Sequence, residues 1–141
     1  MPGVTFNKFN SFVENLAEKK YNLQSDTLMI ALTDVAPVAT NIALSEITQI
    51  AYTNLPTSRV VTVSSSAQTS GLYKLICAIM TLISTGGNVA SFRYAVLYDS
   101  TATGFELIGW YDYGAEIVLQ GANADELILN FDQTNGVINI Q

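Results

Sequence analysis

Histidine is absent from this 141-residue sequence, and cysteine occurs once, as Cys77. The missing histidine removes the commonest general base and the commonest metal ligand of proteins. A single cysteine cannot form an internal disulfide, and Cys77 lies in the most apolar stretch of the chain, where a thiol is usually an inert packing group. We therefore predict a protein that is not an enzyme, with no catalytic residue, no metal site and no cofactor.

Charge is also scarce. Charged residues make up 13% of the chain and hydrophobic residues 49%, whereas about a quarter of the residues of an ordinary globular protein are charged. A monomer with so few surface charges tends to associate, so we expect a partner to cover part of its surface. The net charge of −6 argues against non-specific nucleic-acid binding, which needs a basic surface.

The charges are unevenly placed along the chain. Residues 94–141 contain seven acidic side chains and no basic one, while all six basic side chains fall within residues 1–93. An acidic second part can serve solubility alone, or it can face a basic partner surface. Both interpretations remain open at this point.

Long apolar runs are missing as well. The longest run, residues 75–80, has the length of a strand, far below the roughly 18 residues of a membrane helix. Residues 1–8 lack the charged-then-apolar pattern of a signal peptide. We expect a soluble protein that is made in the cytoplasm and has no membrane segment.

One short helix is predicted near the N-terminus, over residues 12–20. Phe9, Val13 and Leu16 recur at helical spacing, and the sequence SFVE at 11–14 has the form of a capping box. Lys19 and Lys20 would lie in the last turn, where cations suit the helix dipole.

Strand patterns dominate the rest of the chain. Residues 27–33 form an apolar run typical of a buried strand, and residues 34–58 are irregular, with a possible helical turn at 45–50. A polar turn is expected at residues 64–71, a strand end at Gly114, and a type I′ hairpin at Asn135-Gly136 that joins 127–131 to 137–140. The other expected strands cover residues 60–63, 72–83, 91–98, 105–113 and 117–120.

This pattern predicts a mainly β fold of about eight strands spaced roughly 8–14 residues apart, as in a two-sheet, jelly-roll-like β-sandwich. The sandwich would be a single domain over residues 25–141, preceded by a segment of residues 1–24 that carries the short helix.

Carboxylates close to aromatic residues are the best candidates for chemistry. Aromatic platforms beside carboxylates bind sugars, and paired carboxylates run glycosidases, but these residues can equally be solvent-exposed acids and packing aromatics. Asn123, Asp125 and Glu126 could form a calcium site, although their spacing lacks the dense oxygen ligands of a strong motif. The carboxylates considered are Glu106, Asp112, Glu116, Asp125 and Glu126, beside Trp110, Tyr111 and Tyr113.

Large aromatic side chains exceed what one small core needs. Tyrosine, tryptophan and phenylalanine are enriched in the centres of protein–protein interfaces. We therefore predict an interface that includes Phe6, Phe9, Phe12, Tyr94, Tyr98, Trp110, Tyr111 and Tyr113.

The sequence also resembles a family of small tailed-bacteriophage proteins that act as capsid cement, or head decoration, proteins. The resemblance covers nearly the whole chain and consists of pattern matches rather than a chemical motif. It rests on KFNSFVENL (8–16), SDTL (25–28), ALTDVAP (31–37), QTSGLYKL (68–75), FRYAVLY (92–98), LIGWYDYG (107–114) and NGV (135–137).

The resemblance implies a jelly-roll-like structural protein on the outer capsid surface of the virion, made in the cytoplasm of a bacterial host. It would bind the major capsid protein and bridge neighbouring subunits, and self-association as a dimer or trimer is expected. A tail or fibre component, and a carbohydrate-binding module for host attachment, remain the alternatives.

Overall fold

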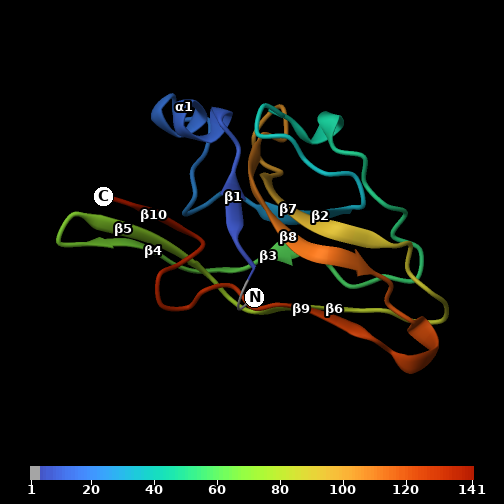
Figure 1. The fold of residues 1–141 in the computed structure, drawn as a ribbon. Coiled ribbons are helices and arrows are strands. Elements are labelled where there is room, and N and C mark those ends of the chain that lie inside the picture. The colour runs from blue at the N-terminus through green and yellow to red at the C-terminus, as the bar shows by residue number, and fades with distance from the viewer. Residues whose placement is uncertain (1–3) are drawn as a thin grey trace.

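The computed structural model describes residues 4–141, so the first three residues of the predicted segment 1–24 lie outside the described residues. Ten strands, one α-helix and two 3₁₀-helices are found within this range (Figure 1). The elements are β1 (Phe6–Lys8), α1 (Ser11–Ala17), β2 (Leu28–Thr33), η1 (Leu44–Glu46), β3 (Val60–Val61), β4 (Val63–Thr69), β5 (Leu72–Cys77), β6 (Met80–Ile83), β7 (Phe92–Asp99), β8 (Leu107–Ile117), η2 (Gly121–Asn123), β9 (Glu126–Leu129) and β10 (Ile138–Ile140).

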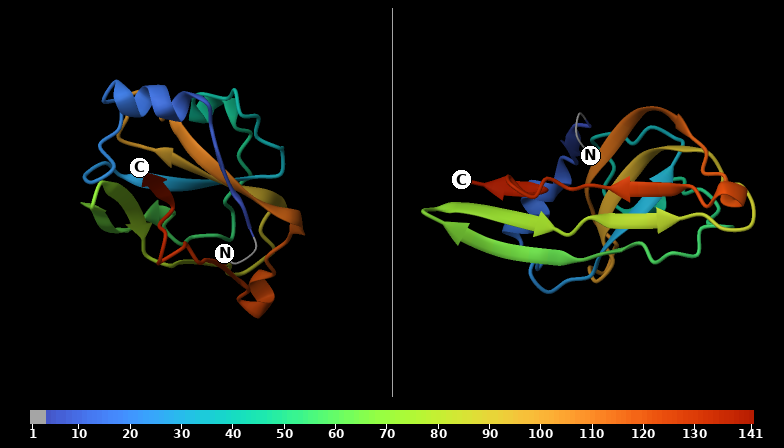
Figure 2. Two further views of the ribbon diagram at one scale, coloured as in Figure 1. Left: turned by 60° about the vertical axis from the view of Figure 1, so that its left-hand side comes forward. Right: turned by 90° about the horizontal axis from the view of Figure 1, so that it is seen from below.

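The strands form two layers. A five-stranded antiparallel sheet has the order β1-β8-β7-β2-β3. The smaller layer consists of a three-stranded sheet, β10-β5-β4, and a two-stranded sheet, β6-β9. Figure 2 (right) shows β5 and β6 end to end, with β10 and β9 end to end beside them. The prediction of a mainly β sandwich with a short N-terminal helix is confirmed.

The main core lies between these layers. Leu28, Ile30 and Leu32 from β2 meet Leu82 from β6 and Leu129 from β9, and all five side chains are fully buried. Because side chains alternate along a strand, Ala31 of β2 points to the opposite face of the larger sheet. There it joins a second buried cluster with Phe9, Ile47, Val96, Tyr98 and Leu107. The larger sheet is therefore buried on both faces.

The segment expected as a polar turn at residues 64–71 is instead the strand β4. It pairs with β5, and the two strands form a hairpin that extends beyond the body of the sandwich (Figures 1 and 2). Serine and threonine side chains suit this strand because much of it faces solvent. Its turn contains Ser70 and Gly71, both with positive φ (52° and 83°), as a type I′ hairpin requires.

The hairpin predicted at Asn135-Gly136 does not form. Only Gly136 of this pair has a positive φ, and the loop is held instead by Asp132, whose Oδ1 accepts the backbone N–H groups of Thr134 and Asn135. β9 pairs with β6 and β10 pairs with β5, so the two segments belong to different sheets. The single strand expected over 72–83 is correspondingly divided into β5 and β6.

The helix is shorter than predicted and lacks its capping box. It ends at Ala17, so Lys19 and Lys20 lie beyond it, and Lys19 has a left-handed φ of 63°. The Ser11 hydroxyl is buried without a hydrogen-bond partner because Asn10 occupies the N-cap position. The 3₁₀-helix η1 stands where a helical turn was expected at 45–50.

Two further boundaries differ from those expected. β8 does not stop at Gly114 but continues to Ile117, with Gly114 at a φ of 80°. The expected strand at 117–120 is reduced to an isolated bridge between Gln120 and Asn88. The N-terminal segment also contributes to the sandwich, because β1 is an edge strand of the larger sheet.

Candidate functional site

Most of the eight predicted interface aromatics belong to the core of the chain itself. Phe9, Phe12, Tyr94, Tyr98 and Tyr111 are each exposed by 8% or less. This corrects the sequence-based prediction. The physical reason is that the larger sheet is buried on both faces, so it uses aromatic side chains on both.

The remaining three, Phe6, Trp110 and Tyr113, are half-buried and pack against the two core clusters. Phe6 lies against Tyr111, with ring centroids 5.1 Å apart, and Trp110 lies against Phe9 at 4.6 Å. None of the eight predicted residues therefore stands out from the surface as an anchor.

The aromatic and acidic residues of β8 do not form an open sugar platform. Trp110 packs on Phe9, and Asp112 is occupied by Arg93, which donates to it through Nε (2.7 Å) and Nη2 (3.0 Å). These hydrogen bonds, with a third from the Gly114 N–H, hold the pKa of Asp112 below its usual range. Its carboxylate neutralises a neighbouring guanidinium rather than facing a ligand.

The proposed calcium ligands serve the loop that leads into β9. The Asp125 Oδ2 atom accepts the Gln120 N–H at 2.9 Å, and the Asn123 amide donates to the Gln120 side chain at 3.0 Å. Glu126 is exposed on β9. Within residues 4–141, no group of three or more histidine, cysteine, aspartate or glutamate side chains is arranged to hold a metal ion.

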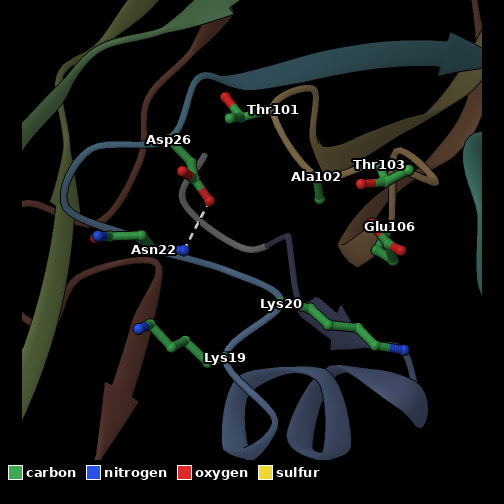
Figure 3. Close-up of a pocket in the computed structure, with 8 residues that line it drawn as sticks. All are labelled: Lys19, Lys20, Asn22, Asp26, Thr101, Ala102, Thr103 and Glu106. Atoms are coloured by element: carbon green, nitrogen blue, oxygen red, sulfur yellow. Dashed lines mark hydrogen bonds between the residues drawn. The ribbon is translucent and has the colours of Figure 1, made fainter.

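Of the two remaining candidate acids, Glu116 is exposed on β8, and Glu106 lines a pocket of about 410 Å³ (Figure 3). In Figure 3, Asp26 and Glu106 stand on different sides of the pocket, and Lys19 and Lys20 lie along another. The Asp26 Oδ2 atom accepts the Asn22 N–H at 2.7 Å. The pocket therefore carries charges of both signs rather than one.

Asp99, at the end of β7, lies next to this pocket and is completely buried. Its Oδ1 atom accepts the N–H groups of Thr101 and Ala102, while its Oδ2 atom receives no hydrogen bond. Burial, and the neighbouring Asp26 carboxyl, raise the pKa of Asp99 to about 6. The two carboxyl groups can hydrogen-bond to each other only when one is protonated, so the nearby Asp26 carboxyl favours the protonated form of Asp99.

An apolar strip on the smaller layer is the surface that best fits a protein partner. Leu82, Leu127 and Leu129 point inward from β6 and β9 and are buried. The alternate positions point outward, and there Ile83 is 37% exposed and Ile128 52% exposed.

Ile79 extends this outward face. It directly precedes β6, is 54% exposed, and lies diagonally across from Ile128, which pairs with Thr81. Such diagonal cross-strand neighbours are about 7 Å apart, close enough for large side chains to touch. We refer to Ile79, Ile83 and Ile128 as the isoleucine strip.

The rim of the strip is acidic. Glu126 pairs with Ile83 and is exposed on the same outward face as Ile128. No lysine or arginine occurs in residues 75–92 or 94–141, which contain both strands. The strip was not predicted from the sequence. The alternating residues of ELIL (126–129) indicate that the strand has two different faces, but alternation alone does not say which face meets the core.

Comparison of the chain with protein-family models, with curated proteins and with solved structures found no match. Among the described residues, no helix has the length and apolar character that a membrane span requires. The function must therefore be argued from the surface of the chain and from its own sequence.

Proposed function

We propose that this chain is a structural virion protein of the capsid cement type, which binds the outer surface of a major capsid shell and bridges neighbouring subunits. The isoleucine strip is the observation that carries the proposal. A sheet face that points outward and contains three half-exposed isoleucines is costly in water unless another surface covers it. Because the sequence resembles phage cement proteins, the covering surface in this proposal is the major capsid shell.

The size of the strip fits a contact that is repeated many times. Burying a whole isoleucine side chain is worth about 1.5–3 kcal/mol, so three half-exposed side chains contribute roughly 3 kcal/mol. Association costs at least about 4 kcal/mol in lost translational and rotational freedom. The strip alone is therefore too small for a tight one-to-one complex, and the dimer or trimer expected from sequence would need additional surface.

A closed lattice changes this balance. When one protein touches two or more fixed neighbours, the later contacts are intramolecular and avoid most of the association cost. The chain offers separated parts for such bridging, since the β4–β5 hairpin extends well away from the β6–β9 sheet (Figure 2). Weak contacts on a rigid sandwich then add up across a shell.

Binding to expanded, undecorated phage heads tests the proposal. Purified chain is mixed with heads, the heads are sedimented, and the bound copies per head are counted by quantitative mass spectrometry. We expect occupancy in the hundreds for the natural chain. Ile128→Glu should lower the affinity at least fivefold, because it places a charge in the strip beside Glu126. Ile128→Ser gives a second, uncharged variant.

Val35→Glu is the matched control. Val35 is also exposed, by 58%, but it lies in the loop after β2, outside the strip. This variant should bind heads as the natural chain does, and thermal unfolding should show that all three variants are folded. A natural chain that ignores the heads contradicts the proposal. Purified virions that contain only a few to a few dozen copies would instead indicate a tail or fibre component.

A further inference from the structure

A second apolar surface lies between the two layers, on the side of the molecule where α1 and β10 approach each other (Figure 1). There a groove of about 570 Å³ is lined by α1, by β10 and by residues of β1. Val13 from α1 is 53% exposed and Ile140 from β10 is 39% exposed, and both line the groove. Phe12 and Ile138 are buried at its base.

Two unpaired strand edges accompany this groove. β10 pairs with β5 on one side only, and β1 pairs with β8 on one side only, so each is the edge strand of its sheet. The groove is lined by five consecutive residues, 137–141, and by Phe6 and Lys8 of β1. An edge strand presents free backbone N–H and C=O groups that can hydrogen-bond to an additional extended chain.

The charge of the groove lining is opposite in sign to the net charge of the chain. The chain carries a net charge of −6, yet Lys8 lies in the groove and no aspartate or glutamate side chain lines it. Through Leu16 and Ile140 the groove meets a second hollow of about 340 Å³, which contains Lys19 and likewise no acidic side chain. Glu18 of the same region is paired with Lys20 at 3.9 Å. The groove is thus an apolar trough whose one charged lining side chain, Lys8, is basic, on a protein with a negative net charge.

We propose that this groove binds an extended segment of another protein, which adds as a strand to the free edge of β10. Alternate side chains of the segment would be apolar, to cover Val13 and Ile140, and its ends would be acidic, to meet Lys8 and Lys19. The complementary charge favours a different protein over a second copy of this acidic chain. The proposal does not depend on the capsid function, since its test uses the isolated chain.

Two labelled heptapeptides test the proposal by fluorescence anisotropy: acetyl-DVTVTVD-amide as the acidic probe and acetyl-KVTVTVK-amide as its basic counterpart. We expect the acidic peptide to bind at least tenfold more tightly than the basic one at low salt. Val13→Glu and Lys8→Glu should each weaken binding of the acidic peptide at least fivefold, and Lys8→Glu should strengthen binding of the basic peptide. Val35→Glu, which adds the same charge outside the groove, should change neither affinity.

Hydrogen exchange locates the bound strand. The backbone amides of β10 that are not bonded to β5 should gain protection when the acidic peptide binds. Equal binding of the two peptides, protection confined to other strands, or no response to Lys8→Glu would overturn the proposal. So would a dimer of the natural chain that Val13→Glu dissociates, because a second copy would then occupy the groove.

Discussion

Replacement of Asp99 by asparagine should make this protein more stable at neutral pH. Asp99 is completely buried, and only its Oδ1 atom receives hydrogen bonds, from Thr101 and Ala102. An asparagine keeps Oδ1 for these two donors. Its Nδ2 group would replace the unpartnered oxygen and could donate to the Asp26 carboxylate. The substitution therefore removes a buried negative charge without removing the contacts that hold the turn.

The sign of the pH effect follows from the raised pKa. The pKa of Asp99 is about 6 in the folded chain and 3.8 in its ordinary state. A raised folded pKa gives stability that is fully present below the unfolded value and is lost as pH rises through the folded value. Between pH 5.0 and pH 7.5 the natural chain should lose about 1–1.5 kcal/mol of unfolding free energy from this one group.

Other charged groups do not reverse this trend. Glu46, Asp112 and Asp132 have lowered pKa values, so the stability they contribute is lost only as pH falls below their ordinary pKa values, 4.5 for Glu46 and 3.8 for the two aspartates. Glu106, Lys19 and Lys20 line the adjoining pocket, so charges of both signs lie near the carboxyl pair. The window from pH 5.0 to 7.5 therefore isolates the carboxyl pair.

The measurement is urea unfolding of the natural chain and of Asp99→Asn at pH 5.0 and pH 7.5, followed by circular dichroism. We expect the natural chain to weaken toward pH 7.5 and the variant to be nearly insensitive to pH, so that the variant is the more stable protein at pH 7.5. Asp132→Asn, the same substitution at an exposed loop, should keep the slope of the natural chain. A natural chain that gains stability from pH 5.0 to 7.5, or a variant with an unchanged slope, would refute the reasoning.

Two further predictions concern packing. Gly109→Ala should detach β1, because a Cβ at this position would overlap the Phe6 ring and lie 2.6 Å from the Asn7 carbonyl oxygen. Thermal unfolding should show that this variant loses about 1–3 kcal/mol or more of stability. The control Gly71→Ala has no atom within 4 Å of the added Cβ and should lose only about 1–2 kcal/mol, because of its positive φ. The Cys77 thiol should react with a thiol reagent only as the chain unfolds, since burial raises its pKa to about 11; rapid labelling of folded protein at pH 8 would contradict this.

The fold class could be predicted because the central strands carry strong local signals. The apolar run at 27–33 and the segment at 91–98 became β2 and β7 with boundaries shifted by one residue. Both strands are buried on both faces, so nearly every residue in them is apolar and the pattern needs no tertiary information.

Strands at the edge of the molecule could not be recognised in the same way. β4 has the sequence VSSSAQT, which is polar because the hairpin is largely solvent-exposed. Asn135-Gly136 has the composition of a hairpin turn, but the pairing of β9 with β6 and of β10 with β5 depends on contacts distant in sequence. Turn residues indicate that the chain changes direction without identifying the strand it will pair with.

The candidate interface was misplaced for a related reason. The prediction assumed a single core, which has no room for aromatic residues such as Tyr98 and Phe9. Both residues belong to a second buried cluster that covers the other face of the larger sheet. The residues that do remain exposed are aliphatic. Isoleucine is among the residues most often buried in protein cores, so composition alone gave no reason to select Ile79 or Ile128 as surface residues.

The layer arrangement explains why the proposed partner surface lies on the smaller layer. In the larger sheet, the face away from the main core is covered by Phe9, Ile47 and Leu44 from segments outside the sheet. The β6–β9 sheet buries its inward leucines equally well, but its outward isoleucines stay half-exposed within the described chain. Because this sheet has only two strands and an uncovered apolar face, we propose that it depends on a neighbour. If Ile128→Glu unfolds at the same temperature as the natural chain, that dependence concerns binding rather than folding.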